Sequence, residues 1–159
     1  MAILTLEALA ASLTGKGRLI GVDPGAKTIG LALSDVERRI ATPLETVSRT
    51  KFAADAARML ALADKFEIAA FVIGLPFNMD GTEGPRAQAT RAFARNLGGL
   101  RAMPIVFWDE RLSTAAVTRA LIEQDVSRAR RAANVDKMAA AYILQGALDR
   151  LRRLTPAQT

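Results

Sequence analysis

The stretch GVDPGAKTIGLALSD, residues 21–35, joins two apolar runs through a short turn. The first run, RLIGVD (18–23), ends in Asp23, and the second, TIGLALSD (28–35), begins directly after the sequence PGAK. Proline and glycine are turn formers, so the two runs are expected to pair as antiparallel strands. A turn explains the glycine and proline, but a carboxylate at the end of a buried strand also has the rigid placement that a metal ligand needs.

The rest of the chain alternates strand-like and helical segments. RRIATPLETVSR (38–49) is expected to add a third strand, with Pro43 at an edge or a bulge. Helices are expected at 51–66, 83–99, 113–124 and 136–154, buried strands at 68–76 and 103–110, and a basic loop at 125–135. A three-stranded antiparallel meander followed by alternating helices and strands predicts an α/β fold, with a mixed sheet, a parallel half and helices on both faces.

The length of 159 residues fits one domain. We expect an N-terminal extension at 1–17 with a short helix capped by Thr5, a single domain at 18–154, and a tail at 155–159. The longest apolar stretch, IAAFVIGLPF, has 10 residues, whereas a membrane span needs roughly 18 or more. The N-terminus carries no basic leader. These features predict a cytoplasmic protein without a membrane partner.

The absence of both cysteine and histidine narrows the possible chemistry. It excludes disulfides, zinc–cysteine sites, cysteine nucleophiles and Ser-His-Asp triads. An enzyme with this composition has to use carboxylates, lysine, tyrosine or a metal-activated water. A metal site made only of carboxylates and carbonyls favours hard ions such as Mg²⁺ or Mn²⁺.

The net charge of +6 is concentrated in the last third of the chain, where residues 111–159 hold nine basic and four acidic side chains. Nucleic acid is the natural partner of such a segment, and a solvated arginine-rich surface is the alternative. The sequence SRARRAAN (127–134) contributes Arg128, Arg130 and Arg131, and no acidic residue lies between Asp125 and Asp136 to pair with them. We expect it to be a mobile loop that a nucleic-acid backbone orders, against the alternative of a basic loop without a task.

Three carboxylates stand at the ends of expected elements. Asp23 and Glu110 end strands, and Asp136 opens the last helix. Ligand sites in open α/β sheets lie at the carboxyl ends of strands. Three converging carboxylates repel one another, and one or two divalent cations would compensate that repulsion, as in the metal sites of phosphoryl-transfer enzymes. The alternative for Asp136 alone is a favourable interaction with the helix dipole.

Neighbouring residues extend this hypothesis. Gly25 would let a phosphate or a metal approach the backbone, and Lys27 would face phosphate oxygens. Side chains alternate along IVFWDE, so Asp109 should lie on the face opposite Glu110 and act as a structural partner, either of Arg111 or of a helix N-terminus.

These motifs resemble the YqgF/RuvX family of RNase H-like nucleases, a family also described as Holliday junction resolvases. The matching stretches are GVDPGAKTIGLALSD, GLPFNMDGTEGPRAQATRAFARNL, VFWDERLST and VDKMAAAYILQGALD. The resemblance implies an RNase H-like fold and a divalent-metal-dependent nuclease that matures the 5′ end of pre-16S ribosomal RNA. It carries the catalytic and metal-binding roles over to Asp23, Glu110 and Asp136.

The resemblance also places the loop NMDGTEG (78–84) near the site. Asn78, Asp80 and Thr82 in this loop either contact the substrate or simply form the turn, and the sequence leaves both open.

Other functions remain possible on the sequence alone. A Holliday junction resolvase acting on branched DNA is one alternative, and a non-catalytic RNA-binding factor for ribosome assembly is another. An actin-like or sugar-kinase-like ATPase shares the strand–Asp–turn–strand pattern but needs a second such domain, for which this chain is too short. The partner is expected to be structured RNA or branched DNA, and the protein a monomer or a homodimer.

Overall fold

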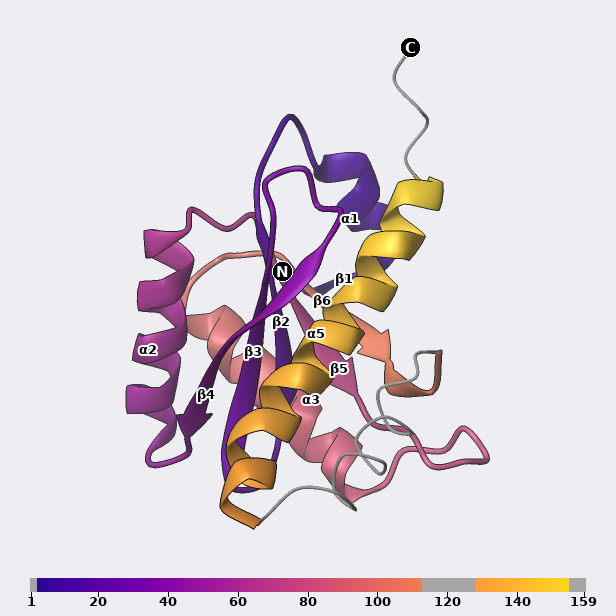
Figure 1. Ribbon diagram of the computed structural model, residues 1–159. Coiled ribbons are helices and arrows are strands. Elements are labelled where there is room, and N and C mark those ends of the chain that lie inside the picture. Colours follow the sequence, from indigo (N-terminus) through magenta and orange to yellow (C-terminus); the bar gives the residue numbers. More distant parts are fainter. Residues whose placement is uncertain (1–2, 113–127, 155–159) are drawn as a thin grey trace.

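The computed structural model describes residues 3–112 and 128–154, with the backbone alone described for 128–136. Six strands form one mixed sheet in the order β1-β6-β5-β2-β3-β4 (Figure 1). The strands are β1 (Ile3–Leu4), β2 (Leu19–Pro24), β3 (Thr28–Ser34), β4 (Ala41–Ser48), β5 (Ala70–Leu75) and β6 (Ile105–Asp109). The helices are α1 (Leu6–Ser12), α2 (Phe52–Lys65), α3 (Pro85–Leu100) and α5 (Arg128–Leu154), and a 3₁₀ turn, η1, spans Glu110–Leu112.

The antiparallel meander of β2, β3 and β4 is confirmed. Strand β2 pairs with β3, and β3 pairs with β4, both antiparallel. In the second pair the register moves from Leu31 opposite Glu45 to Ala32 opposite Pro43, so Leu44 is an extra residue. The expected bulge at Pro43 is therefore present in this edge strand, and bulges of this kind bend the strand that carries them.

The parallel half of the sheet is also confirmed, with one addition. Strands β2, β5 and β6 pair in parallel, and β6 pairs in parallel with β1. The sequence analysis found the short helix capped by Thr5, whose hydroxyl accepts a hydrogen bond from the Ala8 N–H at 3.1 Å. It missed β1, because a strand of two residues is too short to produce a periodic pattern.

Helices cover both faces of the sheet, as expected (Figure 1). Side chains of α2 and α3, including Met59 and Phe93, pack with Ile20 and Phe71 on one face. On the other face, α5 and α1 contribute Leu144 and Leu9 to a second buried cluster. Both clusters consist of buried side chains, so the central strands β2 and β5 are buried on each side, which explains their continuous apolar sequences.

The start of α5 differs from the expectation. A loop was expected at 125–135, with Asp136 opening the helix, but α5 already begins at Arg128. The reason is intrinsic helix propensity, since arginine and alanine dominate residues 128–133 and both are strong helix formers. A basic segment without acidic partners was therefore wrongly interpreted as a mobile loop from residue 128 onward. The helix expected at 113–124 and the tail at 155–159 lie outside the described residues.

Among the described residues, no helix is long and apolar enough to cross a membrane.

Candidate functional site

Asp23 lies near the end of β2 and is 3 % exposed. Side chains alternate along a strand, so Asp23 shares a face with Gly21, and a Cβ on Gly21 would stand 2.6 Å from Cβ of Leu144 in α5. The α5 face of the sheet is thus the face on which Asp23 lies. A carboxylate with this degree of burial is rare, because burying a charge is costly unless the charge is compensated.

Glu110 reaches the same face from the other side of β5. The strand was expected to end at Glu110, but β6 ends one residue earlier, at Asp109, and Glu110 is the first residue of η1; its side chain is partly buried. A Cβ on Gly74 would stand 2.8 Å from Oε1 of Glu110 and 2.5 Å from Cδ1 of Ile143 in α5. The missing side chain of Gly74 therefore creates the space that the Glu110 carboxylate occupies.

The sheet register relates the two acids. Val22 of β2 lies opposite Ile73 of β5, so Asp23 and Gly74 are the next residues along these parallel strands. Asp23 and Glu110 therefore lie on one face of the sheet, on either side of Gly74. The sequence analysis did not single out Gly74, and the signal that could have found it is a glycine within an otherwise bulky buried strand, which indicates close approach of another group.

Asp136 occupies a different position from the one expected. It lies within α5, eight residues after the first residue of the helix, and its side chain is outside the described residues. The helix dipole acts on charges within the first turn, so the alternative role of Asp136 as an N-terminal anion is wrong. Whether Asp136 joins the other two acids is not tested by the described atoms. Among the described side chains, no group of three or more acids is close enough to hold a metal ion.

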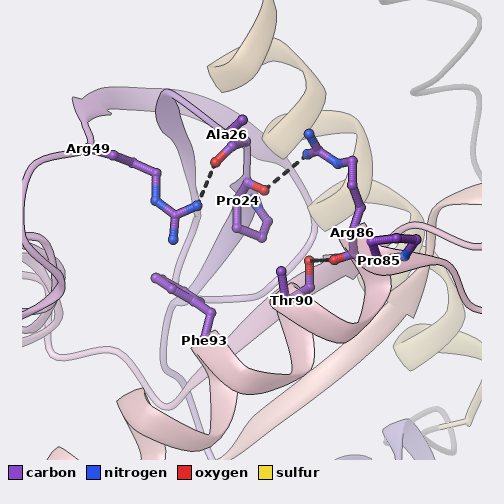
Figure 2. Close-up of a pocket in the computed structure, with 9 residues that line it drawn as sticks. Pro24, Ala26, Arg49, Pro85, Arg86, Thr90 and Phe93 are labelled. Atoms are coloured by element: carbon purple, nitrogen blue, oxygen red, sulfur yellow. Dashed lines mark hydrogen bonds between the residues drawn. The ribbon is translucent and has the colours of Figure 1, made fainter.

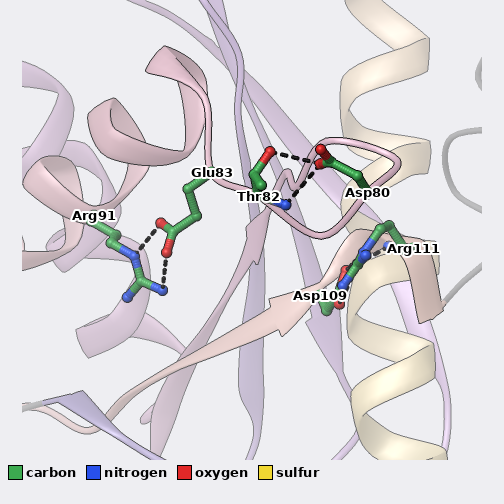
Figure 3. Close-up of polar contacts among 6 residues, drawn as sticks. All are labelled: Asp80, Thr82, Glu83, Arg91, Asp109 and Arg111. Atoms are coloured by element: carbon green, nitrogen blue, oxygen red, sulfur yellow. Dashed lines mark hydrogen bonds and ion pairs between the residues drawn. The ribbon is translucent and has the colours of Figure 1, made fainter.

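The expected face of β6 is confirmed, and with it the partner of Asp109. Ile105 and Phe107 pack in the α2–α3 cluster, and Trp108 packs in the α5 cluster. Asp109 pairs with Arg111, with Nη2 and Oδ2 2.8 Å apart (Figure 3). Hydrogen bonds from the Arg111 guanidinium lower the pKa of the Asp109 carboxyl.

The loop at 78–84 is held by its own hydrogen bonds (Figure 3). The Thr82 hydroxyl and backbone N–H donate to Oδ1 of Asp80 at 2.6 and 3.0 Å, and Nδ2 of Asn78 donates to the Thr82 hydroxyl at 2.9 Å. These bonds lower the pKa of Asp80, with the Thr82 hydroxyl as the largest cause. The turn-forming role of all three side chains is therefore present in the structure, and substrate contact stays a prediction.

The turn after Asp23 is held by two arginines that the sequence analysis missed (Figure 2). Nη1 of Arg49 donates to the Gly25 carbonyl at 2.7 Å, and Nη2 of Arg86 donates to the Pro24 carbonyl at 3.3 Å. Lys27, at the end of this turn, is exposed, and its carbonyl accepts the Arg49 backbone N–H at 2.9 Å. Arg86 lies within a stretch that matches the family, but nothing in that stretch or around Arg49 indicates a contact with the turn after Asp23, because the contact joins segments far apart in the sequence.

The last expected substrate contacts are Arg128, Arg130 and Arg131. Their backbone forms the first turn of α5, and their side chains lie outside the described residues.

The described residues fit a hard divalent cation. Asp23 and Glu110 supply oxygen donors on one face, and the space over Gly74 admits a carboxylate that a Cβ would displace. With no histidine or cysteine in the chain, oxygen ligands are all that the sequence offers, which is the donor set of Mg²⁺ or Mn²⁺ rather than zinc.

Comparison with known proteins agrees with the sequence resemblance. Residues 17–150 match the family model of RuvX, described as "Holliday junction resolvase". A relative from Beijerinckia indica is 70 % identical over 149 residues, covering 94 % of this chain and 90 % of the relative. A relative from Methylocella silvestris is 67 % identical over 152 residues, covering 96 % of this chain and 94 % of the relative. Both are named "Putative pre-16S rRNA nuclease".

Two solved structures share the fold. Thermus thermophilus RuvC in complex with a Holliday junction substrate has a TM-score of 0.54 at 16 % identity, covering 89 % of this chain and 99 % of RuvC. The yeast mitochondrial Holliday junction resolvase Ydc2 has a TM-score of 0.51 at 14 % identity, covering 94 % of this chain and 85 % of Ydc2. At this level of identity the likeness concerns the fold, and it confirms the RNase H-like sheet expected from the sequence.

Proposed function

The chain belongs to the RuvX family, and from this premise we propose that it is a divalent-metal-dependent nuclease that processes the 5′ end of pre-16S ribosomal RNA. The high identity to relatives named for this activity supports the substrate. The observation that carries the chemistry is the placement of Asp23 and Glu110 on one face of the sheet, on either side of Gly74. Action on ribosomal RNA also agrees with the expected cytoplasmic location.

Asp23, Glu110 and Asp136 are the proposed ligands for one or two Mg²⁺ or Mn²⁺ ions. The backbone positions support the third member. The Ala140 carbonyl lies 2.9 Å from the Cβ position of Gly21, and the amino end of α5 lies at the end of the sheet that holds the β2–β3 turn (Figure 1). Asp136 precedes Ala140 by four residues, a rise of about 6 Å, and Asp23 follows Gly21 by two, a rise of about 7 Å. Asp136 should therefore be level with Asp23.

A bound divalent ion supplies Lewis-acid activation of the phosphodiester and of the attacking water. The protein's own part is to fix the carboxylates before substrate arrives. Asp23 is held on a central strand paired on both sides, and the Glu110 carboxylate lies over Gly74, where Ile143 of α5 also packs. Exposed Lys27 lies at the end of the same turn, where its ammonium group would attract the backbone phosphates of the substrate.

The test is cleavage of an end-labelled pre-16S RNA fragment, with Mg²⁺, Mn²⁺ or EDTA, by the wild type and by Asp23→Asn, Glu110→Gln and Asp136→Asn. Each variant should lose cleavage, EDTA should abolish it, and the fold should persist because fewer like charges then share the site. Asp64→Asn is the matched control, because Asp64 pairs with Arg101 on the surface. Normal cleavage by Asp136→Asn would remove that residue from the metal site.

A second candidate is a Holliday junction resolvase, favoured by the description of the matching family model. A four-way DNA junction in the same assay separates the two functions, since a resolvase should act as a two-fold dimer and make paired cuts. If all three acid variants retain full function in ribosome maturation, the protein is an RNA-binding assembly factor instead.

A further inference from the structure

We propose that Arg49 and Arg86 form a second phosphate-binding site, on the side of the β2–β3 turn opposite the carboxylates, that binds a backbone phosphate of the nucleic acid which is not itself cleaved. This inference rests on the proposed nuclease function for the identity of the ligand.

The site is a pocket of about 190 Å³ between the β2–β3 turn and the amino-terminal half of α3 (Figure 2). Pro24, Gly25 and Ala26 line it from the turn, and Arg49 and Arg86 are the charged side chains of its lining. Both arginines are exposed, so a ligand can reach their guanidinium groups without displacing buried structure.

The charge on these two arginines distinguishes them from the described arginines that pair with a carboxylate. Carboxylates neutralise Arg58, Arg91, Arg101 and Arg111, whose partners are Glu45, Glu83, Asp64 and Asp109. Within the described part of the chain, Arg49 and Arg86 donate instead to carbonyl oxygens of the turn. A carbonyl orients a guanidinium but does not cancel its charge, so two positive charges remain beside one short turn.

Both side chains also keep donors for a ligand. A guanidinium has five N–H donors. Arg49 uses one on the Gly25 carbonyl, and its guanidinium carbon lies 5.4 Å from the centre of the Phe93 ring, which orients its plane. Arg86 uses one on the Pro24 carbonyl. The remaining fork geometry matches the oxygens of a phosphate, which planar guanidinium groups bind in bidentate fashion.

A phosphate fits this pocket better than a nucleobase. Bases bind proteins by stacking on exposed aromatic faces. Phe93 is only 4 % exposed, lies under Arg49, and makes an edge-to-face contact with Phe52 at 5.7 Å. No aromatic face is therefore open to a base at the described lining of the pocket.

The position of the pocket explains why the bound phosphate would be near the cleaved phosphodiester in the nucleic-acid strand rather than part of it. Asp23 lies on the α5 face of the sheet, whereas the pocket lies on the α3 face. The turn between them is only a few residues wide, with exposed Lys27 at its far end. A nucleic-acid strand that crosses this turn would present one phosphate to the carboxylates and another to the two arginines.

The experiment measures binding of a fluorescently labelled single-stranded RNA oligonucleotide by anisotropy, in EDTA, over a range of KCl concentrations. The variants are Arg49→Gln, Arg86→Gln, the double variant, and Arg86→Lys. The control is Arg38→Gln, because Arg38 also donates to carbonyls, those of Gly17 and Gly15, but at the opposite end of β2. Thermal melts identify any variant that does not fold. If the double variant does not fold, the test rests on Arg86→Gln, because Arg86 makes one long hydrogen bond of 3.3 Å to the turn and its loss should disturb the fold least.

We expect the double variant to bind more weakly and to lose up to about 0.7 of the log–log salt slope for each phosphate contact removed. Arg86→Lys should keep the slope, and Arg38→Gln should match the wild type. An oligonucleotide with one uncharged methylphosphonate, placed at successive positions, should weaken wild-type binding at one position beside the cleavage site and leave the double variant unaffected. Free inorganic phosphate should compete only weakly if the ligand is a nucleic-acid phosphate.

An unchanged salt slope in the double variant would overturn the proposal, and so would an equal loss in Arg38→Gln. Loss of cleavage with an unchanged slope would mean that the arginines only brace the turn. Cleavage tests the proposed nuclease function, and the salt dependence of binding tests the arginine site. The two can fail separately, because a protein that binds RNA without cleaving it can still show a smaller salt slope in the double variant.

Discussion

The indole ring of Trp108 lies directly against Gly146, with Cζ2 2.8 Å from the position that a Cβ on residue 146 would occupy. At this contact the carboxyl-terminal half of α5 lies close to β6. Trp108 is 8 % exposed, and its Nε1 has no hydrogen-bond partner among the described residues. The ring therefore stabilises the structure by packing. If α5 moved away from β6, this packing would be lost, and no hydrogen bond of the indole among the described residues would offset the loss.

The first prediction concerns that distance. Gly146→Ala should destabilise the protein by about 1–3 kcal/mol, because the added methyl overlaps the ring. Trp108 is the one tryptophan of the chain, so its fluorescence reports the displacement directly. Gly99→Ala in α3 is the matched control, since nothing lies within 4 Å of its Cβ position. It should be neutral, or stabilising by up to about 1 kcal/mol. Equal melting temperatures for Gly146→Ala and the wild type would contradict the prediction.

The second prediction tests whether the space over Gly74 is needed for activity as well as for stability. Gly74→Ala should displace both Ile143 and the Glu110 carboxylate, costing about 1–3 kcal/mol of stability. Unlike Gly146→Ala, it should also remove most of the cleavage activity at temperatures where the variant is folded. Cleavage of labelled RNA at such a temperature, beside a thermal melt, makes the comparison. Full activity in Gly74→Ala would mean that cleavage does not depend on the position of the Glu110 carboxylate.

The third prediction concerns pH. Arg111 lowers the pKa of Asp109 in the folded protein, so the ion pair stabilises the fold above the unfolded pKa, about 3.9, and this contribution is lost as the pH falls through the folded pKa. Asp109→Asn should therefore destabilise the protein at neutral pH, by about 0.2–1 kcal/mol for a partly exposed pair. Urea unfolding at neutral pH and at about pH 3 should show the difference shrinking in acid.

Activity provides the other half of that test. Asp109 points away from the face of Glu110, so Asp109→Asn should still cleave RNA. An inactive variant with native stability would give Asp109 a role in the site.

A fourth prediction concerns the amino end of α5. Replacing Arg128, Arg130 and Arg131 together by alanine should weaken binding across nucleic-acid substrates and reduce the salt slope, while metal affinity stays nearly unchanged. Because alanine also favours helix, the circular dichroism signal should not fall. An unchanged slope would move the basic surface to Arg150, Arg152 and Arg153 near the other end of the helix.

The sequence predicts the sheet well because its signals are local. Turn residues after Asp23 and the alternation along β6 depend on neighbours a few positions away, and both predictions agree with the structure. The start of α5 was missed because charge and helix propensity conflict in the segment after Ser127, and propensity prevailed.

The site is predicted less completely, since its remaining parts depend on contacts between distant segments. Gly74 matters because Glu110 and Ile143 approach it, and Arg86 matters because α3 begins beside the turn after β2. No pattern within either segment carries that information. Asp23 and Glu110 could be singled out because strand ends are visible in the sequence, whereas Gly74, which lies between them, could not.

The two-residue strand β1 and the bulged strand β4 form the edges of the described sheet. A long, flat edge is a template on which another chain can add a strand and start aggregation. Here one edge is too short to serve as that template, and the other is interrupted by a proline that lacks an N–H. The Ala41 N–H of β4 is already bonded to Gln145 of α5. The described sheet therefore offers no long, regular edge on which a second copy could add a strand, and this should protect the folded protein from polymerising through its strands.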